Sequence, residues 1–326
     1  MKVAVIGAGL AGLSLATTLK KEDIDVTVYE QDPHVGGRLL SQEFESSSVD
    51  LGAQYFTARE PAFISQVNEW MQAEAACLWD FHPYTFQSGR LAISKDSEQR
   101  YIGIPSNQSI TKVLAEKISN LNKNHTISEV NSIDDQWQLV TPQQVIEKTF
   151  DWVCYATPPQ TTLDLCAIEE INNQINPDFF PGYTLILWSS IQLNPPVQGV
   201  FVNNNPISWI SQNSAKPFRA LEKGSCWLVQ STPEWAEKNK HLSVEEIKKK
   251  LTAKFFDIFK ITNERIITND HLYFWNTAKA KAEPNPQGFL IDTKNKIGVC
   301  GDWLKGGRVE GAYMSGYELA QALLKL

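Results

Sequence analysis

The chain has 326 residues, a net charge of −7 and a pI near 5.4, and 42% of its residues are hydrophobic. This length and composition are ordinary for a globular protein with a sizeable core and two domains. The acidic balance and the lack of a dense basic cluster argue against binding to nucleic acid, and no apolar run reaches the roughly 20 residues of a membrane span.

The first forty residues carry the strongest pattern in the sequence. Lys2–Ile6 is short, apolar and β-branched, which predicts a buried parallel strand. Gly7, Gly9 and Gly12 follow it and open an amphipathic run to Leu19. Such glycines permit the tight turn, the close approach of a pyrophosphate and the close packing of helix on strand. We therefore predict that a dinucleotide binds at the start of this helix, where free N–H groups and the helix dipole favour phosphate.

A second apolar run, Val26–Tyr29, ends at Glu30. A carboxylate about 20 residues after the glycines can accept hydrogen bonds from both ribose hydroxyls, which favours FAD or NAD over NADP. Gly36, Gly37 and Arg38 come next. This turn resembles the Gly-Gly-Arg of flavoproteins of the glutathione-reductase and amine-oxidase type, in which the Arg lies near the FAD pyrophosphate. The resemblance favours FAD over NAD.

The middle of the chain predicts a mixture of helices and strands, with a polar, serine-rich surface turn at Ser41–Ser48. Helices are expected at Pro61–Met71, Pro105–Leu121 (with Ser109 as N-cap) and Val244–Phe259 after Ser243. Strands are expected within Trp79–Ile93 (with a tight turn at Gly89), and at Thr126–Val130, Trp137–Val140, Val145–Phe150 and Trp152–Ala156.

The last forty residues show a pattern similar to that of the first forty, with a buried strand, an acid at a strand end and a glycine-containing helix start. Ile297–Gly301 reads as a buried strand that ends at Asp302, and a helix is expected from Glu310 to Leu326. The acid can bind a ribityl hydroxyl, and the helix N-terminus can face the negative N1–O2 edge of a reduced flavin. A helix that simply closes the sheet is the alternative.

These patterns predict an α/β fold with two domains. A Rossmann-type FAD-binding domain with a parallel sheet is expected from residues 1–60, 101–160 and 286–326. An α+β substrate domain with a largely antiparallel sheet is expected from residues 61–100 and 161–285. The five cysteines are widely spaced and form no CxxC, which predicts buried thiols in a reducing, cytoplasmic compartment and no metal site. The sequence does not specify an oligomeric state.

Three stretches resemble the bacterial renalase family. They are Asp50–Arg59, which reads DLGAQYFTAR; Trp209–Ile210 with Asn213–Pro217 and Trp227–Trp235; and Gly301–Trp303 with Gly307–Ala312 and Ser315–Gly316. The first is far more specific than a GxGxxG pattern. One stretch departs from the family: bacterial members have a His-Arg-Trp-like sequence where this chain has Asp270–Trp275, which lacks the basic residue.

The resemblance implies a two-domain flavoprotein of the amine-oxidase or p-hydroxybenzoate-hydroxylase architecture. The implied reaction oxidises the 2- and 6-dihydro isomers of NAD(P)H to NAD(P)+ by hydride transfer to flavin N5, and O2 is reduced to H2O2. Because the product is an aromatic cation, this chemistry needs positioning more than acid–base catalysis, and no catalytic side chain is singled out. The FAD is expected to be non-covalent, since no Cys or His stands at an obvious attachment point.

Site residues follow from the motifs and the resemblance together. The expected FAD contacts are Gly7, Gly9, Leu10, Ala11, Gly12, Glu30, Gln31, Gly37, Arg38, Gln54, Tyr55, Val130, Asp302, Glu310 and Gly311. The expected substrate contacts are Phe56, Thr57, Ala58, Arg59, Arg90 and Trp303, with Arg59 and Arg90 as candidates for a substrate phosphate.

Two other functions fit the same motifs. A flavin amine oxidase would share the FAD signatures and would need an aromatic pair and a lysine near flavin N5. A flavin-binding sensor or partner protein would bind FAD without turnover. The aromatic second domain favours a substrate cavity over the sensor.

Overall fold

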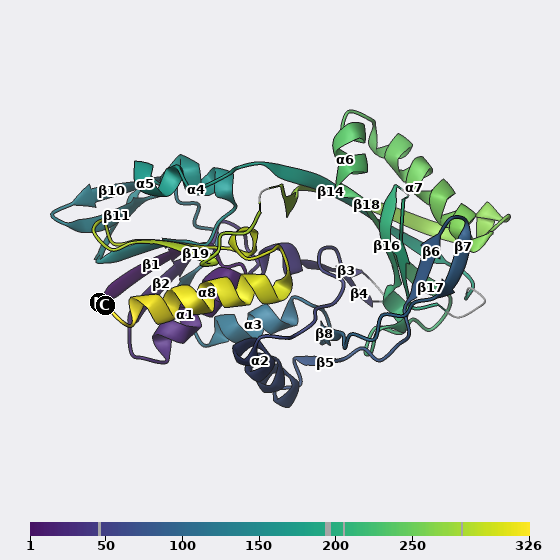
Figure 1. Ribbon diagram of the computed structural model, residues 1–326, viewed down its shortest axis with the longest axis horizontal. Coiled ribbons are helices and arrows are strands. Elements are labelled where there is room, and N and C mark those ends of the chain that lie inside the picture. The colour runs from purple at the N-terminus through teal and green to yellow at the C-terminus, as the bar shows by residue number, and fades with distance from the viewer. Residues whose placement is uncertain (45–46, 193–196, 205, 282) are drawn as a thin grey trace.

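The computed structural model covers residues 1–326 and describes all of them except residues 45–46, 193–196, 205 and 282. Two regions lie side by side along the long axis of the molecule in Figure 1. One contains β1, β2, α1 and α8, and the other contains β14–β18 with α6 and α7.

The first region is built on a six-stranded sheet of order β19-β20-β13-β1-β2-β9. Its strands are parallel except for β19, which runs antiparallel to β20. The parallel sheet predicted from the sequence is therefore confirmed. The strands are β1 (Lys2–Ile6), β2 (Asp25–Tyr29), β9 (Leu121–Asn122), β13 (Trp152–Tyr155), β19 (Phe289–Asp292) and β20 (Ile297–Cys300).

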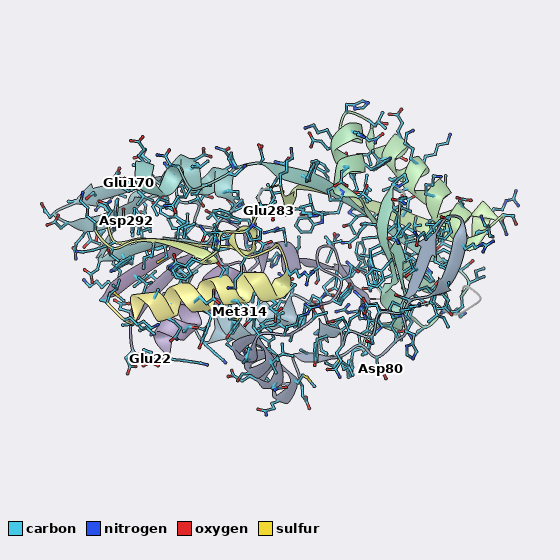
Figure 2. All side chains as sticks on the ribbon, in the orientation of Figure 1. Glu22, Asp80, Glu170, Glu283, Asp292 and Met314 are labelled. Carbon is cyan, nitrogen blue, oxygen red and sulfur yellow. The ribbon has the colours of Figure 1, made fainter. Side chains whose placement is uncertain are left out.

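Both faces of this sheet are covered (Figure 1). Helices α1 (Leu10–Lys20), α2 (Pro61–Gln72), α3 (Ser109–Glu116) and α8 (Val309–Leu323) contribute to one buried core. Met314 of α8, labelled in Figure 2, belongs to it. The other face carries a three-stranded antiparallel sheet and two short helices. These are β10 (Glu129–Ile133), β11 (Gln136–Val140), β12 (Val145–Phe150), α4 (Pro159–Leu165) and α5 (Glu169–Asn172).

The second region is a seven-stranded sheet of order β18-β14-β17-β16-β15-β6-β7, in which only the β15–β6 pair is parallel. The helices α6 (Pro233–Asn239) and α7 (Val244–Phe259) pack on it. Helix α7 has the predicted bounds and starts after Ser243, which caps it in a reciprocal capping box with Glu246. The strands are β6 (Tyr84–Gln87), β7 (Arg90–Ile93), β14 (Phe179–Ser189), β15 (Gly199–Val202), β16 (Ile207–Gln212), β17 (Ser225–Ser231) and β18 (Ile267–Ala280).

Two small sheets join the regions. The serine-rich stretch, which the sequence predicts as a surface turn between short strands, includes β3 (Ser41–Phe44) and the start of the strand paired with it, β4 (Ser47–Asp50). Residues 45–46 lie outside the described residues. The strands β5 (Ala76–Leu78) and β8 (Tyr101–Gly103) form the other pair. Short 3₁₀ turns occur at Gly37–Leu39, Asn213–Ala215, Glu264–Ile266 and Asp302–Leu304.

Helix α3 is shorter than the predicted Pro105–Leu121, and Gln108 rather than Ser109 is its N-cap. The turn before it is held by tertiary hydrogen bonds instead: the Asn107 N–H donates to Asp50, and the Gln108 amide donates to the Val35 carbonyl. Beyond the helix, Leu121 leaves to pair with β2 as an edge strand.

Packing does not follow the predicted domain limits everywhere. Phe63, Val67 and Trp70 of α2 lie in the core of the first region, although residues 61–100 were assigned to the substrate domain. Leu165 and Ile171 of α4 and α5 likewise pack under the first sheet. The domain limits remain a prediction.

Candidate functional site

The turn between β1 and α1 requires glycine at two positions for steric reasons. A Cβ added at Gly7, whose φ is +104°, would lie 2.6 Å from the Ala156 carbonyl oxygen. One added at Gly12 would lie 2.1 Å from the Gly7 carbonyl oxygen. These contacts hold the start of α1 tightly against the end of β1.

Gly9 differs, because a Cβ added there would meet nothing within 4 Å. Gly9 is the N-cap of α1 and offers no side-chain cap to the helix N–H groups. The open space beside Gly9 therefore lets a ligand approach the first turn of α1. Unpaired N–H groups at the positive end of a helix bind phosphate oxygens, so this cradle fits a pyrophosphate.

Glu30 is held at the end of β2 by two backbone donors. Its Oε2 accepts the Ala8 N–H at 2.7 Å and its Oε1 accepts the Asp32 N–H at 3.0 Å. Burial raises the pKa of this carboxyl, while the two N–H bonds oppose the rise. A carboxylate has about four acceptor positions, so Glu30 retains capacity for ribose hydroxyls. Gln31, the next predicted contact, is exposed.

The Gly-Gly-Arg turn lies directly on the first glycine turn. The Gly36 N–H donates to the Ala8 carbonyl at 2.9 Å, and Gly9 and Gly36 form a bridge. Beyond it, the Arg38 guanidinium forms an ion pair with Asp302. The structure therefore brings the predicted pyrophosphate ligand and the predicted ribityl ligand, 264 residues apart in sequence, into contact.

Helix α8 also reaches this place. A Cβ added at Gly316 would lie 2.0 Å from the Ala11 carbonyl oxygen, so α8 crosses α1 in direct backbone contact. Glu310, a predicted cofactor contact, accepts the N–H groups of Arg59 and Glu60 at 2.5 and 2.8 Å. Its carboxylate thus ties the start of α8 to the start of α2. Gly311 packs against the Lys305 carbonyl, 2.4 Å from the position of an added Cβ.

The segment from Ala53 to Thr57 presents alternate side chains to opposite sides. Ala53, Tyr55 and Thr57 are partly exposed, whereas Gln54 and Phe56 are buried. An extended chain alternates in this way. Phe56 packs between the rings of Phe63, Trp70 and Tyr101. The accessible wall is therefore Ala53, Tyr55 and Thr57, and the predicted substrate contact of Phe56 is not supported by its position.

Gln54 was expected to line the flavin, but its amide is fully used inside the protein. Its Nε2 donates to the Asp50 and Gly52 carbonyls at 2.7 and 3.0 Å. Its Oε1 accepts from Ser211 at 2.9 Å and from Lys216 at 3.2 Å. An amide has two donors and one oxygen with two lone pairs, so no polar capacity is left for a ligand. Gln54 instead fastens the wall to the second sheet.

A buried ionic cluster lies behind the wall. Asp50 accepts from Lys216 at 2.8 Å and from Arg219, and all three side chains are buried. Desolvation, followed by the charge of Arg219, lowers the pKa of Lys216 to about 8. The two cations more than offset burial at Asp50, so the pKa of its carboxyl is lowered. The sequence offered no sign of this cluster beyond the Asn213–Pro217 resemblance.

Tyr55 faces aromatic and cationic neighbours. Its ring lies 5.3 Å from that of Trp209, and the Arg100 guanidinium sits 5.1 Å from its centroid. Burial raises the pKa of the Tyr55 hydroxyl, against the opposing charge of Arg100. The rings of Tyr273 and Trp275 on β18 have centroids 4.7 Å apart, and the Trp275 indole donates to the carbonyl of Leu51, just before the wall.

Three predicted contacts are not brought to this site. Arg90 is exposed on the edge strand β7, at the opposite end of the molecule from β1 in Figure 1. Trp303 is buried in the core and donates to the Thr157 carbonyl at 3.2 Å. Val130 is likewise a core side chain, so only its backbone could face a ligand. The last three predicted residues to place are Gly37, which follows Gly36 in the turn, and Ala58 and Arg59, which follow the wall.

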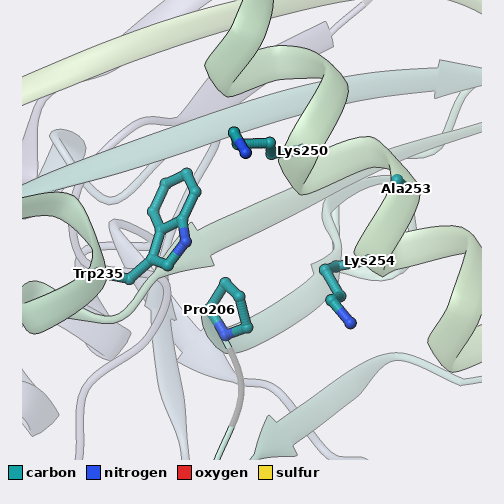
Figure 3. Close-up of a pocket in the computed structure, with 5 residues that line it drawn as sticks. All are labelled: Pro206, Trp235, Lys250, Ala253 and Lys254. Atoms are coloured by element: carbon teal, nitrogen blue, oxygen red, sulfur yellow. The ribbon is translucent and has the colours of Figure 1, made fainter. Parts of the chain in front are cut away.

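Other surface features lie elsewhere. A hollow of about 340 Å³ on the outside of the second region is lined by Pro206, Trp235, Lys250, Ala253 and Lys254 (Figure 3). Within the described residues, no group of His, Cys, Asp and Glu side chains is arranged to hold a metal ion. Among those same residues, no helix combines the length and apolar character needed to cross a bilayer.

Comparisons with known proteins agree with this geometry. Residues 5–70 match the family model of the NAD(P)-binding Rossmann-like domain. Over 60 residues, or 18% of this chain, the sequence is 45% identical to protoporphyrinogen oxidase 2 of Arabidopsis thaliana. Over 68 residues, or 21% of this chain, it is 37% identical to 1-hydroxycarotenoid 3,4-desaturase of a Flavobacterium species. The matched segments span only 12% and 14% of those relatives.

Solved structures match over the whole chain. A candidate protoporphyrinogen oxidase from an Exiguobacterium species superposes with a TM-score of 0.80 at 11% identity, covering 100% of this chain and 99% of that one. Cyclohexylamine oxidase from Brevibacterium oxydans gives 0.76 at 11% identity, covering 99% and 98%. This chain therefore shares its overall fold with these two oxidase structures, and its residues 5–70 match a NAD(P)-binding Rossmann-like domain.

Proposed function

We propose that this protein is a renalase-like FAD-dependent oxidase that converts the 2- and 6-dihydro isomers of NAD(P)H to NAD(P)+. The observation that carries the proposal is the meeting of the glycine turn, Glu30, Arg38 and Asp302 at one place beside the Ala53–Thr57 wall. When bound there, FAD would accept a hydride from the dihydropyridine at N5 and, with a proton, return two electrons to O2 as H2O2.

Different residues would bind different parts of the cofactor. The N–H groups at the start of α1 would bind the pyrophosphate, with Gly9 leaving room for it. Glu30 would take the ribose hydroxyls. Arg38 would exchange its contact with Asp302 for a phosphate, since a guanidinium binds phosphate bidentately, and Asp302 would then be free to accept a ribityl hydroxyl.

The side chains of the wall fit a substrate that can donate a hydride without first losing a proton to a general base. The raised pKa of Tyr55 keeps its phenol neutral at physiological pH, so it can donate a hydrogen bond but cannot remove a proton. Aromatic side chains such as Tyr55 and Trp209 can hold a flat ring, and Arg59 beside them can bind a phosphate of a dinucleotide. Oxidation of a dihydropyridine asks for little more than this positioning.

A flavin amine oxidase is the second candidate, and one observation favours it. Tyr273 and Trp275 form an aromatic pair, and Trp275 lies against Gly52, which precedes the wall, 3.3 Å from the position of an added Cβ. A lysine near flavin N5 would also be needed. Lys216 is held against Asp50 and Gln54 in the buried cluster, so this lysine is already engaged. A flavin-binding sensor without turnover is the candidate from another class.

The deciding experiment mixes the purified protein, without oxygen, with borohydride-treated NAD+, with putrescine and with protoporphyrinogen IX. Rapid bleaching of the flavin absorbance by the NADH isomers alone supports the proposal, and admitting air should then restore the yellow colour and release H2O2. Bleaching by the amine or the porphyrinogen alone would replace it with the corresponding oxidase. A flavin that dithionite reduces but none of the three does would favour the sensor, and a preparation that takes up no FAD would remove all three.

A further inference from the structure

An acidic loop covers one end of the Ala53–Thr57 wall. Residues 94–99 connect β7 of the seven-stranded sheet to β8 beside α2, so the loop passes between the two regions (Figure 1). Two of its carboxylates rest on arginines. Glu98 pairs with Arg59 at 2.8 Å, and Asp96 pairs with Arg100 at 2.8 Å. The loop thus neutralises two cations next to the wall.

Both arginines contact side chains of the wall. Arg59 donates to the Thr57 hydroxyl at 2.9 Å, and the Arg100 guanidinium stacks on Tyr55. A third arginine, Arg308, stands two residues before Glu310, whose carboxylate accepts the backbone N–H of Arg59 at 2.5 Å. Arg308 is exposed at the N-cap of α8. Arg59 therefore contacts Thr57, Arg100 contacts Tyr55, and the helix that begins after Arg308 is tied to Arg59 through Glu310.

The side chain of Arg100 is only 3% exposed, and it lies between the rings of Tyr55, Phe81 and Phe201. Its Nε has no hydrogen-bond partner within the described part of the chain. The same holds for the indole N–H of Trp209, whose ring lies 5.3 Å from that of Tyr55. Buried donors are usually paired. Two unpaired donors in the wall of one site point to an acceptor oxygen that arrives with a ligand.

We propose that Arg59, Arg100 and Arg308 form the subsite for the pyrophosphate of the dinucleotide substrate, and that Glu98 occupies Arg59 until the substrate displaces it. The inference rests on the proposed function and deepens it. The Arg59 and Glu98 side chains are 44% and 50% exposed, and such pairs are weak and easily exchanged. The Asp96–Arg100 pair is far more buried, so it stays in place and fixes the orientation of Arg100.

The displacement makes the loop a determinant of affinity. A pyrophosphate offers Arg59 two charge-assisted hydrogen bonds in the geometry that a guanidinium prefers. It must compete with a carboxylate that is tethered to the same molecule. Removing the negative charge of Glu98 should therefore tighten the binding of a pyrophosphate ligand. Loss of a polar group near a binding site ordinarily weakens binding, so the expected direction is specific to this competition.

The test compares three variants in the oxidised holoprotein. Glu98→Gln removes the carboxylate that competes for Arg59. Arg59→Gln removes the guanidinium that would bind the pyrophosphate. Glu22→Gln is the control. Glu22 is exposed at the end of α1 (Figure 2), so its replacement deletes the same charge away from the wall. Binding of NAD+, of inorganic pyrophosphate and of nicotinamide, which lacks phosphate, is measured by calorimetry at 50 and 300 mM NaCl.

Glu98→Gln should bind NAD+ and pyrophosphate about three- to tenfold more tightly at 50 mM salt, with a smaller gain at 300 mM. Arg59→Gln should bind both at least about tenfold more weakly. Glu22→Gln should match the wild type, and nicotinamide should not distinguish the proteins. If NAD+ binds wild type and Glu98→Gln equally, the subsite is wrong while the proposed function stands. If pyrophosphate follows the expected pattern and NAD+ does not bind, the subsite stands and the dinucleotide substrate is wrong. Failure of the wild type and all three variants to bind either anion overturns the subsite.

Discussion

Two glycines of the first turn allow the ligand contact to be separated from the fold. At Gly9 the backbone has a φ of −68°, which alanine adopts freely, and an added methyl group meets no protein atom within 4 Å. At Gly12 the methyl would lie 2.1 Å from the Gly7 carbonyl oxygen, so the backbone of α1 must move by about 1 Å to admit it. Helix α1 is buried along its whole length from Leu10 to Leu19, so it cannot yield easily.

We therefore expect Gly9→Ala to change the free energy of unfolding by no more than about 0.5–1 kcal/mol, the cost of alanine at an N-cap. Its methyl would occupy the space into which the pyrophosphate fits, and FAD affinity should fall at least tenfold, or about 1.4 kcal/mol. Gly12→Ala should lose about 3 kcal/mol or more of stability through overpacking.

Urea unfolding of the apoprotein, followed by tryptophan fluorescence, measures the first quantity. Quenching of FAD fluorescence on titration with apoprotein measures the second. If Gly9→Ala binds FAD as tightly as the wild type, the phosphate does not approach Gly9, and the assignment of this turn to a dinucleotide is wrong. If Gly12→Ala is as stable as the wild type, the backbone contact that we describe is not tight.

Three further predictions follow from the buried groups. Asp50→Asn should cost about 3–5 kcal/mol because it leaves Lys216 and Arg219 buried without a counter-charge, whereas Lys216→Met should cost clearly less; equal urea midpoints for the two variants would contradict this. Since the pKa of Lys216 is lowered from 10.5 to about 8, the unfolded chain binds more protons than the folded one between those values. The stability of the wild type relative to Lys216→Met should therefore rise with pH across that window. Urea midpoints of both proteins at pH 7, 8.5 and 10 measure this, and a difference between the two midpoints that does not change with pH would contradict it. Glu30→Gln should weaken FAD binding about tenfold or more through loss of a charged acceptor, and an unchanged dissociation constant would exclude Glu30 from the site.

Local sterics explain why the glycine turn could be predicted from sequence. The requirement for glycine at positions 7 and 12 arises from atoms within the same strand–turn–helix unit or its neighbouring strand, and spacing alone reports it. The hairpin at Gly89 and the capping box at Ser243 were predictable for the same reason. Each is settled by residues close together in the chain.

Features that depend on long-range contacts could not be predicted from the sequence. Arg90 and Arg100 stand ten positions apart, yet one is exposed on an edge strand and the other is buried among aromatic rings beside Tyr55. The rings around Arg100 come from distant parts of the chain, so its burial depends on the fold. The partners Lys216 and Arg219 lie 166 and 169 residues from Asp50, so no pattern near Asp50 reveals a buried charge cluster.

Gln54 shows how such contacts decide the role of a residue within a motif. The sequence predicts that the stretch lies at the site, and the alternation of an extended chain decides which of its side chains can reach a ligand. Gln54 and Phe56 fall on the protein side, and Tyr55 and Thr57 on the other. To decide which alternate side chains face a ligand, one must know that Phe56 is buried, and only the fold shows this.

The same segment explains where substrate selection has to occur. Its first residues are fastened to the second region, through Asp50 to Lys216 and through the Leu51 carbonyl to Thr184 and Trp275. Its far end is fastened to α8, because Glu310 accepts the backbone N–H groups that follow the wall. A wall anchored at both ends cannot adapt to different ligands. Adaptation is left to the side chains and the loop that rest on it, and the half-exposed pair of Arg59 and Glu98 is the contact there that breaks most easily. This is why we expect changes at residue 98 to alter which anions bind, and changes at residue 50 to alter whether the wall forms at all.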